Sequence, residues 1–262
     1  GRAVHTVFTP FTLSFWRWAV ALAILLPFVW RSLRTQAPLI RQHGPILLLL
    51  SVLGVVNFNT FVYLGLQSTT ATTAVLMLSV TPVLIVALSF LLLRQTVTGR
   101  QALGILISLV GVLVIVARGD LPALLAWRIN PGDGWVLAAV FSWALYSVCL
   151  RWRPAKLQPL NFQTATIMIG LAILTPLYGW DLAQGHTVAV NAATVSSILY
   201  LALFPSILAY IFWNRAVAEL GANRTGQFLH LMPAFGAVLS MIFLDERLYG
   251  FHAVGIILIA LG

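Results

Sequence analysis

The sequence predicts an all-α integral membrane protein built from an inverted repeat of two five-helix units. Apolar residues make up 60% of the 262 residues and charged residues only 8%, whereas about a quarter of a soluble domain is charged. The apolar residues gather in long runs, and a helix of about 20 residues crosses a hydrocarbon core of about 30 Å. β-Barrel strands would be about 10 residues long with alternating polarity, and the sequence shows no such pattern.

The apolar runs follow one another along the chain. The first covers residues 11–30, and a basic segment separates it from the next. The later runs are 45–66, 71–93, 101–117, 134–150, 160–180, 195–213, 225–244 and 249–262. Each run except the last is long enough to cross a membrane. Residues 118–133 end in a turn-forming Asn-Pro-Gly-Asp sequence, so we expect them to connect the two repeats, 1–117 and 134–262.

Residues 82–111 are repeated without a gap at residues 233–262. A shift of 151 positions places Pro82 on Pro233, Gly104 on Gly255 and Gly111 on Gly262. Matched prolines and glycines mark backbone geometry, so two copies of one structural unit are expected.

The repeat also predicts a helix that this chain lacks. A shift of 149 positions places Pro10 on Pro159 and Pro27 on Pro176. The helix 134–150 would then have its partner before residue 1. We therefore expect the parent protein to have ten helices, with a first helix of about 20 residues missing here.

Two homologous units of five spans insert in opposite directions. In the ten-helix numbering, the loops after helices two, four, six and eight hold most of the Lys and Arg residues, which predicts that these loops and both parent termini are cytoplasmic. Net charge +9 then indicates anionic lipid headgroups as the partner, and not nucleic acid. The loop residues are Arg31, Arg34, Arg41, Arg94, Arg100, Arg151, Arg153, Lys156, Arg215 and Arg224, against Arg2, Arg118, Arg128 and Arg247 on the other side.

Several segments resemble the EamA repeats of the drug/metabolite transporter superfamily. They include residues 63–66 (Tyr-Leu-Gly-Leu), 78–82 (Leu-Ser-Val-Thr-Pro) and 244–248 (Leu-Asp-Glu-Arg-Leu). Within the superfamily the chain most resembles the YddG-type exporters of aromatic and neutral amino acids. The resemblance implies a ten-helix carrier of the bacterial inner membrane with a central cavity and alternating access. Arg94-Gln95 departs from the pattern, because the second repeat keeps an acidic pair at that place.

Three prolines fall inside predicted spans and are candidate hinges. Pro82, Pro205 and Pro233 each remove a backbone hydrogen bond in an apolar medium. A static kink repaired by neighbouring groups is the alternative to a gating hinge.

Polar and aromatic residues on shared helix faces are candidates for substrate binding. Polar groups within spans are costly unless they face a cavity or another helix. The alternative is that the aromatic rings face lipid and the small polar groups bond to the preceding turn. The candidates are Asn59, Tyr63, Ser79, Trp143, Tyr146, Ser206, Tyr210 and His230.

Arg17 is the charged residue that lies well inside a span. Its side chain could snorkel to the outer headgroups, with Trp16 and Trp18 as interfacial residues. The other interpretation is an anion contact at the outward mouth of the cavity.

The acidic residues all fall in predicted loops or at helix ends, so we expect facilitated transport without ion coupling; His230 is the candidate if protons are coupled. We expect no cofactor, no metal and no enzymatic activity, because the histidines are scattered and there is one cysteine. We further expect a monomer.

The predicted function is export of small neutral metabolites, including aromatic amino acids. The alternatives are a drug or nucleotide-sugar carrier of the same superfamily, or a membrane protein with a structural or receptor role.

Overall fold

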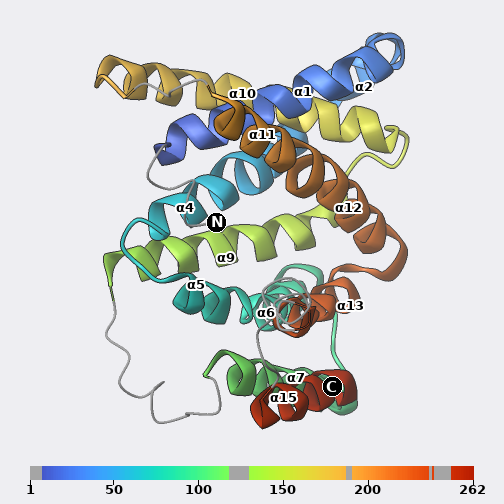
Figure 1. The fold of residues 1–262 in the computed structure, drawn as a ribbon. Coiled ribbons are helices and arrows are strands. Elements are labelled where there is room, and N and C mark those ends of the chain that lie inside the picture. Colours follow the sequence, from blue (N-terminus) through green and yellow to red (C-terminus); the bar gives the residue numbers. More distant parts are fainter. Residues whose placement is uncertain (1–7, 118–129, 187–190, 236–237, 239–248) are drawn as a thin grey trace.

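The computed structural model describes residues 8–117, 130–186, 191–235, 238 and 249–262, and these residues form helices and no strands (Figure 1). The predicted all-α fold is therefore confirmed. The helices are α1 (Pro10–Thr35), α2 (Ala37–Gln42), α3 (Gly44–Leu50), η2 (Ser51–Asn57), α4 (Phe58–Gly65), α5 (Ala71–Leu78), α6 (Thr81–Leu93), α7 (Gly99–Val116), α9 (Pro131–Cys149), η3 (Leu150–Trp152), α10 (Pro159–Ala183), α11 (Ala192–Leu201), η4 (Ala202–Leu208), α12 (Ala209–Leu220), α13 (Ala222–Gln227), η5 (Phe228–His230) and α15 (Gly250–Leu261).

Seven helical stretches of the described chain are long and apolar enough to cross a membrane. They match the first seven predicted runs, and α15 is a shorter apolar helix in the last run. The predicted run 225–244 lies partly outside the described residues. The seven stretches are Pro10–Thr35, Gly44–Gly65, Thr73–Leu93, Gly99–Val116, Pro131–Trp152, Pro159–Ala183 and Ala192–Leu220.

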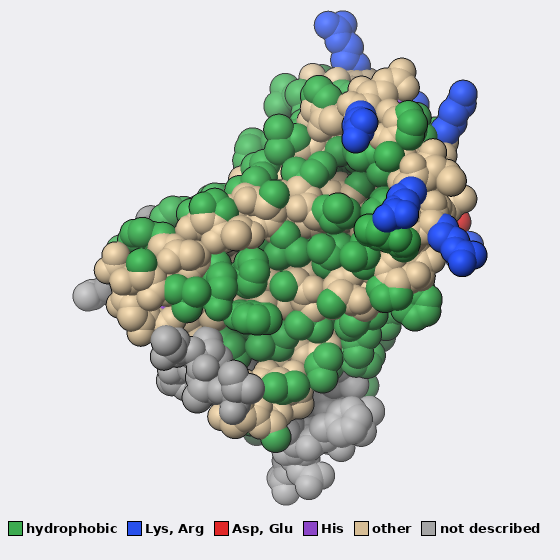
Figure 2. All heavy atoms as spheres, turned by 90° about the horizontal axis from the view of Figure 1, so that it is seen from above, with side chains coloured by type: hydrophobic (Ala, Val, Ile, Leu, Met, Phe, Trp, Pro, Cys, Tyr) green, Lys and Arg blue, Asp and Glu red, His purple; other side chains and the backbone are tan. Residues whose placement is uncertain are grey.

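Basic side chains mark one end of the bundle. The ten Lys and Arg residues of the predicted cytoplasmic loops are all exposed except Arg153, which is half-buried. Figure 2 shows exposed Lys and Arg side chains gathered toward the end where α1 passes into α2, beside a largely hydrophobic face. The four arginines predicted on the other side lie outside the described residues, so the orientation stays a prediction.

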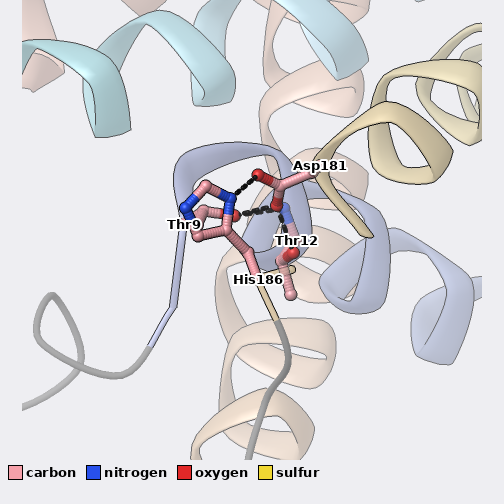
Figure 3. A network of polar contacts seen from close by, with 4 residues as sticks. All are labelled: Thr9, Thr12, Asp181 and His186. Atoms are coloured by element: carbon pink, nitrogen blue, oxygen red, sulfur yellow. Dashed lines mark hydrogen bonds and ion pairs between the residues drawn. The ribbon is translucent and has the colours of Figure 1, made fainter. Parts of the chain in front are cut away.

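A buried carboxylate fastens the start of α1 to the end of α10 (Figure 3). Asp181 is 2% exposed. It accepts hydrogen bonds from the hydroxyls of Thr9 and Thr12, the latter at 2.6 Å, and lies 2.9 Å from Nδ1 of His186. Thr9 also caps α1, because its hydroxyl accepts from the backbone N–H of Thr12. The two helices thus pack side by side with opposite directions.

Two π-helices occupy equivalent places in the two halves of the chain. Ser51–Asn57 and Ala202–Leu208 are related by the 151-residue shift that relates the repeats. A π-helix changes the i→i−4 hydrogen-bond pattern and is frequent at functional sites. The wider turns of a π-helix leave carbonyl groups without a backbone donor, and side chains of other helices can donate hydrogen bonds to them.

Two spans are broken just before the matched prolines. Helix α5 ends at Leu78 with Ser79 as its C-cap, and α6 begins at Thr81 with Pro82 in its first turn. In the second half, the 3₁₀-turn η5 precedes residues 231–235, which are helical and include Pro233. The breaks lie at equivalent positions of the repeat.

Glycines allow α7 and α15 to pack closely, at the far side of the bundle from α1 and α10 (Figure 1). A Cβ built on Gly111 would lie 2.7 Å from the carbonyl oxygen of Gly255, and one on Gly104 would lie 2.5 Å from that of Gly262. The shift of 151 positions relates Gly104 to Gly255 and Gly111 to Gly262, so the two contacts are equivalent in the repeat. The repeated glycines therefore meet across a two-fold interface between the halves.

We predict that Gly111→Ala destabilises the protein by roughly 1–3 kcal/mol, because the added methyl group forces the two backbones apart. The measurement is thermal unfolding of the purified protein in detergent. Gly134→Ala is the matched control, since nothing lies within 4 Å of its Cβ position and Ala favours a helix by roughly 0.5–1 kcal/mol. Equal unfolding temperatures for the two variants would contradict the close packing.

Candidate functional site

A cavity of about 380 Å³ lies where α1, α4, α9 and α12 meet the two broken helices. Its volume falls in the range of about 300–1,000 Å³ that is typical of small-molecule sites. The polar groups on its wall are Arg17, Asn59, Tyr63, Ser79 and Thr81. The aromatic groups are Phe58, Tyr63, Trp143, Tyr210 and Trp213, and both Pro205 and Pro233 also line it.

Arg17 points into the protein and is only 5% exposed. Its Nη1 donates to Oδ1 of Asn59 at 2.6 Å and to the hydroxyl of Tyr63 at 2.9 Å. Its Nε donates to the Ser206 hydroxyl, and Nη2 to the carbonyl of Pro205 at 3.0 Å. The snorkelling interpretation of Arg17 is therefore wrong, because neighbouring helices supply acceptors inside the bundle.

The carbonyl groups of the two π-helices hold the polar side of the cavity together. The Gly54 carbonyl accepts from the Tyr210 hydroxyl and from Nδ2 of Asn59, the latter at 3.3 Å. Asn59 also donates to the Tyr210 oxygen at 3.2 Å. The equivalent carbonyl in the second half, that of Pro205, accepts from Arg17. Asn59 and Tyr210 are themselves related by the 151-residue shift, so they meet on the two-fold axis.

Trp143 is the centre of the aromatic wall. Its ring centroid lies 4.6 Å from that of Phe58 and 5.2 Å from those of Tyr146, Tyr210 and Trp213. Aromatic pairs at such distances each contribute about 0.5–1.5 kcal/mol beyond their buried area. The aromatic wall thus consists of rings that pack against one another around Trp143.

A second cavity of about 850 Å³ opens at the basic end of the bundle. Ser147 lines this second cavity, and its hydroxyl accepts from Nε1 of Trp213, which lines the first, at 3.1 Å. Tyr146 donates to Oδ1 of Asn214 at 2.7 Å in the same layer. The linings of the two cavities therefore meet at the contact between Trp213 and Ser147. The basic residues of the second cavity are Arg94, Arg151, Arg153 and Arg224.

His230 joins the two broken helices behind the cavity. It is fully buried, with Nδ1 2.8 Å from the Ser108 hydroxyl and Nε2 3.1 Å from the carbonyl of Ser79. Ser79 and His230 are again a pair related by the 151-residue shift. The carbonyl exposed by the break after α5 is thus satisfied by the equivalent residue of the other half.

The structure brings most of the predicted residues to one cavity, but not all of them. Arg17, Asn59, Tyr63, Ser79, Trp143 and Tyr210 line it, together with the prolines 205 and 233. Tyr146, Ser206 and His230 lie behind its wall and reach it only through other side chains. Pro82 is buried in the first turn of α6 and is not on the wall.

Phe58 and Trp213 line the cavity but are not among the eight predicted binding residues. No sequence signal separates Phe58 from its apolar neighbours, whereas Trp213 follows Tyr210 by three residues on the same helix face. Among the described residues no group of three His, Cys, Asp or Glu side chains could hold a metal ion.

Comparisons with known proteins agree with this architecture. The model of the EamA-like transporter family matches residues 1–117 and 130–262. An uncharacterized transporter of Bacillus subtilis, YyaM, is 26% identical over 99% of this chain and 86% of its own length. A probable terminal-alkyne amino-acid exporter of Streptantibioticus cattleyicolor is 27% identical over 77% of this chain and 66% of its own. A solved crystal structure covers 99% of this chain, and 87% of its own, with a TM-score of 0.76 and 17% identity.

We predict that Tyr210→Phe lowers the free energy of unfolding by about 1–3 kcal/mol, because the buried amide of Asn59 and the Gly54 carbonyl lose a partner. Thermal unfolding in detergent measures the effect. Tyr200→Phe is the control, since Tyr200 is 60% exposed. If both variants unfold at the same temperature as the unsubstituted protein, the hydroxyl of Tyr210 does not stabilise the π-helix.

Proposed function

The chain belongs to the EamA-like transporter family, and from that premise we propose that it exports small neutral metabolites, including aromatic amino acids, across the bacterial inner membrane. The observation that supports this most is the cavity of about 380 Å³ walled by Phe58, Trp143, Tyr210 and Trp213. A predominantly apolar wall with a few polar groups suits a molecule with an apolar body and a polar end.

The transport path in this proposal runs through both cavities. The hydrogen-bonded pair of Trp213 and Ser147 is the proposed layer between the central cavity and the basic one, because one of the two residues lines each cavity. Opening of this layer, with closure of the opposite mouth, would give alternating access. The breaks before Pro82 and Pro233 are the proposed hinges, because the helix halves on either side share few backbone hydrogen bonds.

The proposed direction is outward from the cytoplasm. The basic end of the bundle is assigned to the cytoplasm by the positive-inside rule. A related chain is named a probable terminal-alkyne amino-acid exporter, which supports amino acids as substrates. The arginines around the second cavity would raise the local concentration of molecules that bear a carboxylate.

Transport is proposed to be facilitative. Ion coupling usually depends on ionisable groups within the membrane, and no acidic side chain lines the central cavity among the described residues. Asp133 and Asp181 are buried at helix ends, where each accepts hydrogen bonds from neighbouring threonines or backbone. Glu219 is exposed and pairs with Arg215 at 2.7 Å.

The test is efflux of labelled amino acids from proteoliposomes that contain the protein in full length. We expect aromatic amino acids to leave without an imposed pH gradient, and Trp143→Ala to slow them by roughly tenfold or more, because an apolar contact with the substrate is lost. Trp152→Ala is the matched control, since Trp152 is 47% exposed at the basic end.

Efflux of other metabolites with no efflux of amino acids would contradict the proposed substrate. Strict dependence on the pH gradient would contradict facilitated transport. If Trp143→Ala unfolds at a much lower temperature, Trp143→Phe replaces it in the assay. This variant retains an aromatic ring, so we expect it to retain part of the efflux rate.

A further inference from the structure

We propose that Arg17 makes the central cavity a receptor for a carboxylate on an apolar body, and that the α-amino group of an amino acid adds nothing to its binding. This inference rests on the proposed function and specifies its substrates as molecules that bear a carboxylate, whether or not they also bear an amino group. It predicts that organic acids without an amino group are bound at least as well as the corresponding amino acids.

The first argument is charge. Each described acceptor around the Arg17 guanidinium is a neutral oxygen, from Asn59, Tyr63, Ser206 or Pro205. A buried charge is costly unless it is paired with an opposite charge. No acidic residue of the described chain lines the cavity. A bound anion would supply the missing charge.

The second argument is the geometry of the donors. A guanidinium has five N–H groups, and the described contacts use one on Nε, two on Nη1 and one on Nη2. One N–H of Nη2 is therefore available on a residue that lines the cavity. Tyr63 also lines it and is only half-buried, so a carboxylate oxygen could replace its hydroxyl on Nη1. The two nitrogens would then hold a carboxylate in the bidentate way that arginine favours.

The third argument concerns the amino group. An ammonium bound next to that carboxylate would lie near the positive charge of Arg17, which repels it. The ring faces of Trp143 and Phe58 offer it an attraction of about 0.5–2 kcal/mol. The ammonium group must also give up its hydrogen bonds to water when it enters the cavity. We therefore expect that the amino group does not increase the affinity of the ligand.

Three ligands with the same phenyl group test the proposal: phenylalanine, 3-phenylpropionate and phenethylamine. Binding to the purified protein is measured by tryptophan fluorescence, because Trp143 and Trp213 line the cavity, and by the rise in unfolding temperature that a ligand produces. We expect 3-phenylpropionate to bind at least as tightly as phenylalanine. Phenethylamine, which lacks the carboxylate, should bind about 10- to 100-fold more weakly.

Arg17→Gln should remove the difference between 3-phenylpropionate and phenethylamine, whereas Arg17→Lys should keep part of it. A purely structural role of Arg17 predicts that both ligands weaken together and that their ratio is unchanged. Arg34→Gln is the matched control, because Arg34 is exposed and stacks on Trp30 with its guanidinium carbon 4.2 Å from the ring centre. If Arg17→Gln does not fold, the comparison of the three ligands on the unsubstituted protein still tests the proposal.

Equal binding of phenethylamine and 3-phenylpropionate by the unsubstituted protein would overturn the proposal, and so would weaker binding of 3-phenylpropionate than of phenylalanine. A different outcome would contradict the proposed function alone. Binding and efflux of 3-phenylpropionate without efflux of amino acids would support the role of Arg17 and contradict amino-acid export.

Discussion

The structure depends on one requirement of the membrane interior, that every backbone carbonyl must find a donor inside the protein. The π-helices at Ser51–Asn57 and Ala202–Leu208 present the carbonyls of Gly54 and Pro205 to other helices. Tyr210 and Asn59 donate to the first, and Arg17 to the second. Each donor is thereby fixed in place on the wall of the cavity. The cavity has polar side chains at these two places because the carbonyl groups there need hydrogen-bond donors.

Symmetry explains where the contacts lie. Asn59 with Tyr210 and Ser79 with His230 are pairs of equivalent residues that bond to each other, and two such pairs define an axis through the centre of the bundle. Arg17 breaks this symmetry. Its equivalent, 149 residues later, is Thr166, whose hydroxyl donates to the Gln163 carbonyl instead. The scaffold is therefore two-fold, whereas the charge of the site comes from one half only.

The spans and the repeat could be predicted from the sequence because length, hydropathy and matched glycines are local or periodic signals. Gly104 and Gly111, which the repeat aligns with Gly255 and Gly262, do meet those two glycines in space. The π-helix Ser51–Asn57 could not be predicted, since it contains no residue that forces one, whereas in Ala202–Leu208 only Pro205 marks an irregular backbone. Arg17 was ambiguous for the same kind of reason: its direction depends on acceptors from Asn59, Tyr63 and Ser206, which only the packing brings together. His230 was placed on the cavity wall, but its bond to Ser108 holds it behind.

The aromatic wall and Arg17 lie on the same cavity but act on different parts of a ligand. Trp143 contacts other rings on several sides, so its position is fixed by packing, and any apolar body of suitable size can lie against it. Size exclusion of this kind discriminates weakly, by about 1–3 kcal/mol per methylene group. A buried charge discriminates far more strongly, because a ligand without the opposite charge leaves it unpaired. Selectivity in this cavity should therefore be strict for the charged end of the substrate and permissive for its apolar end.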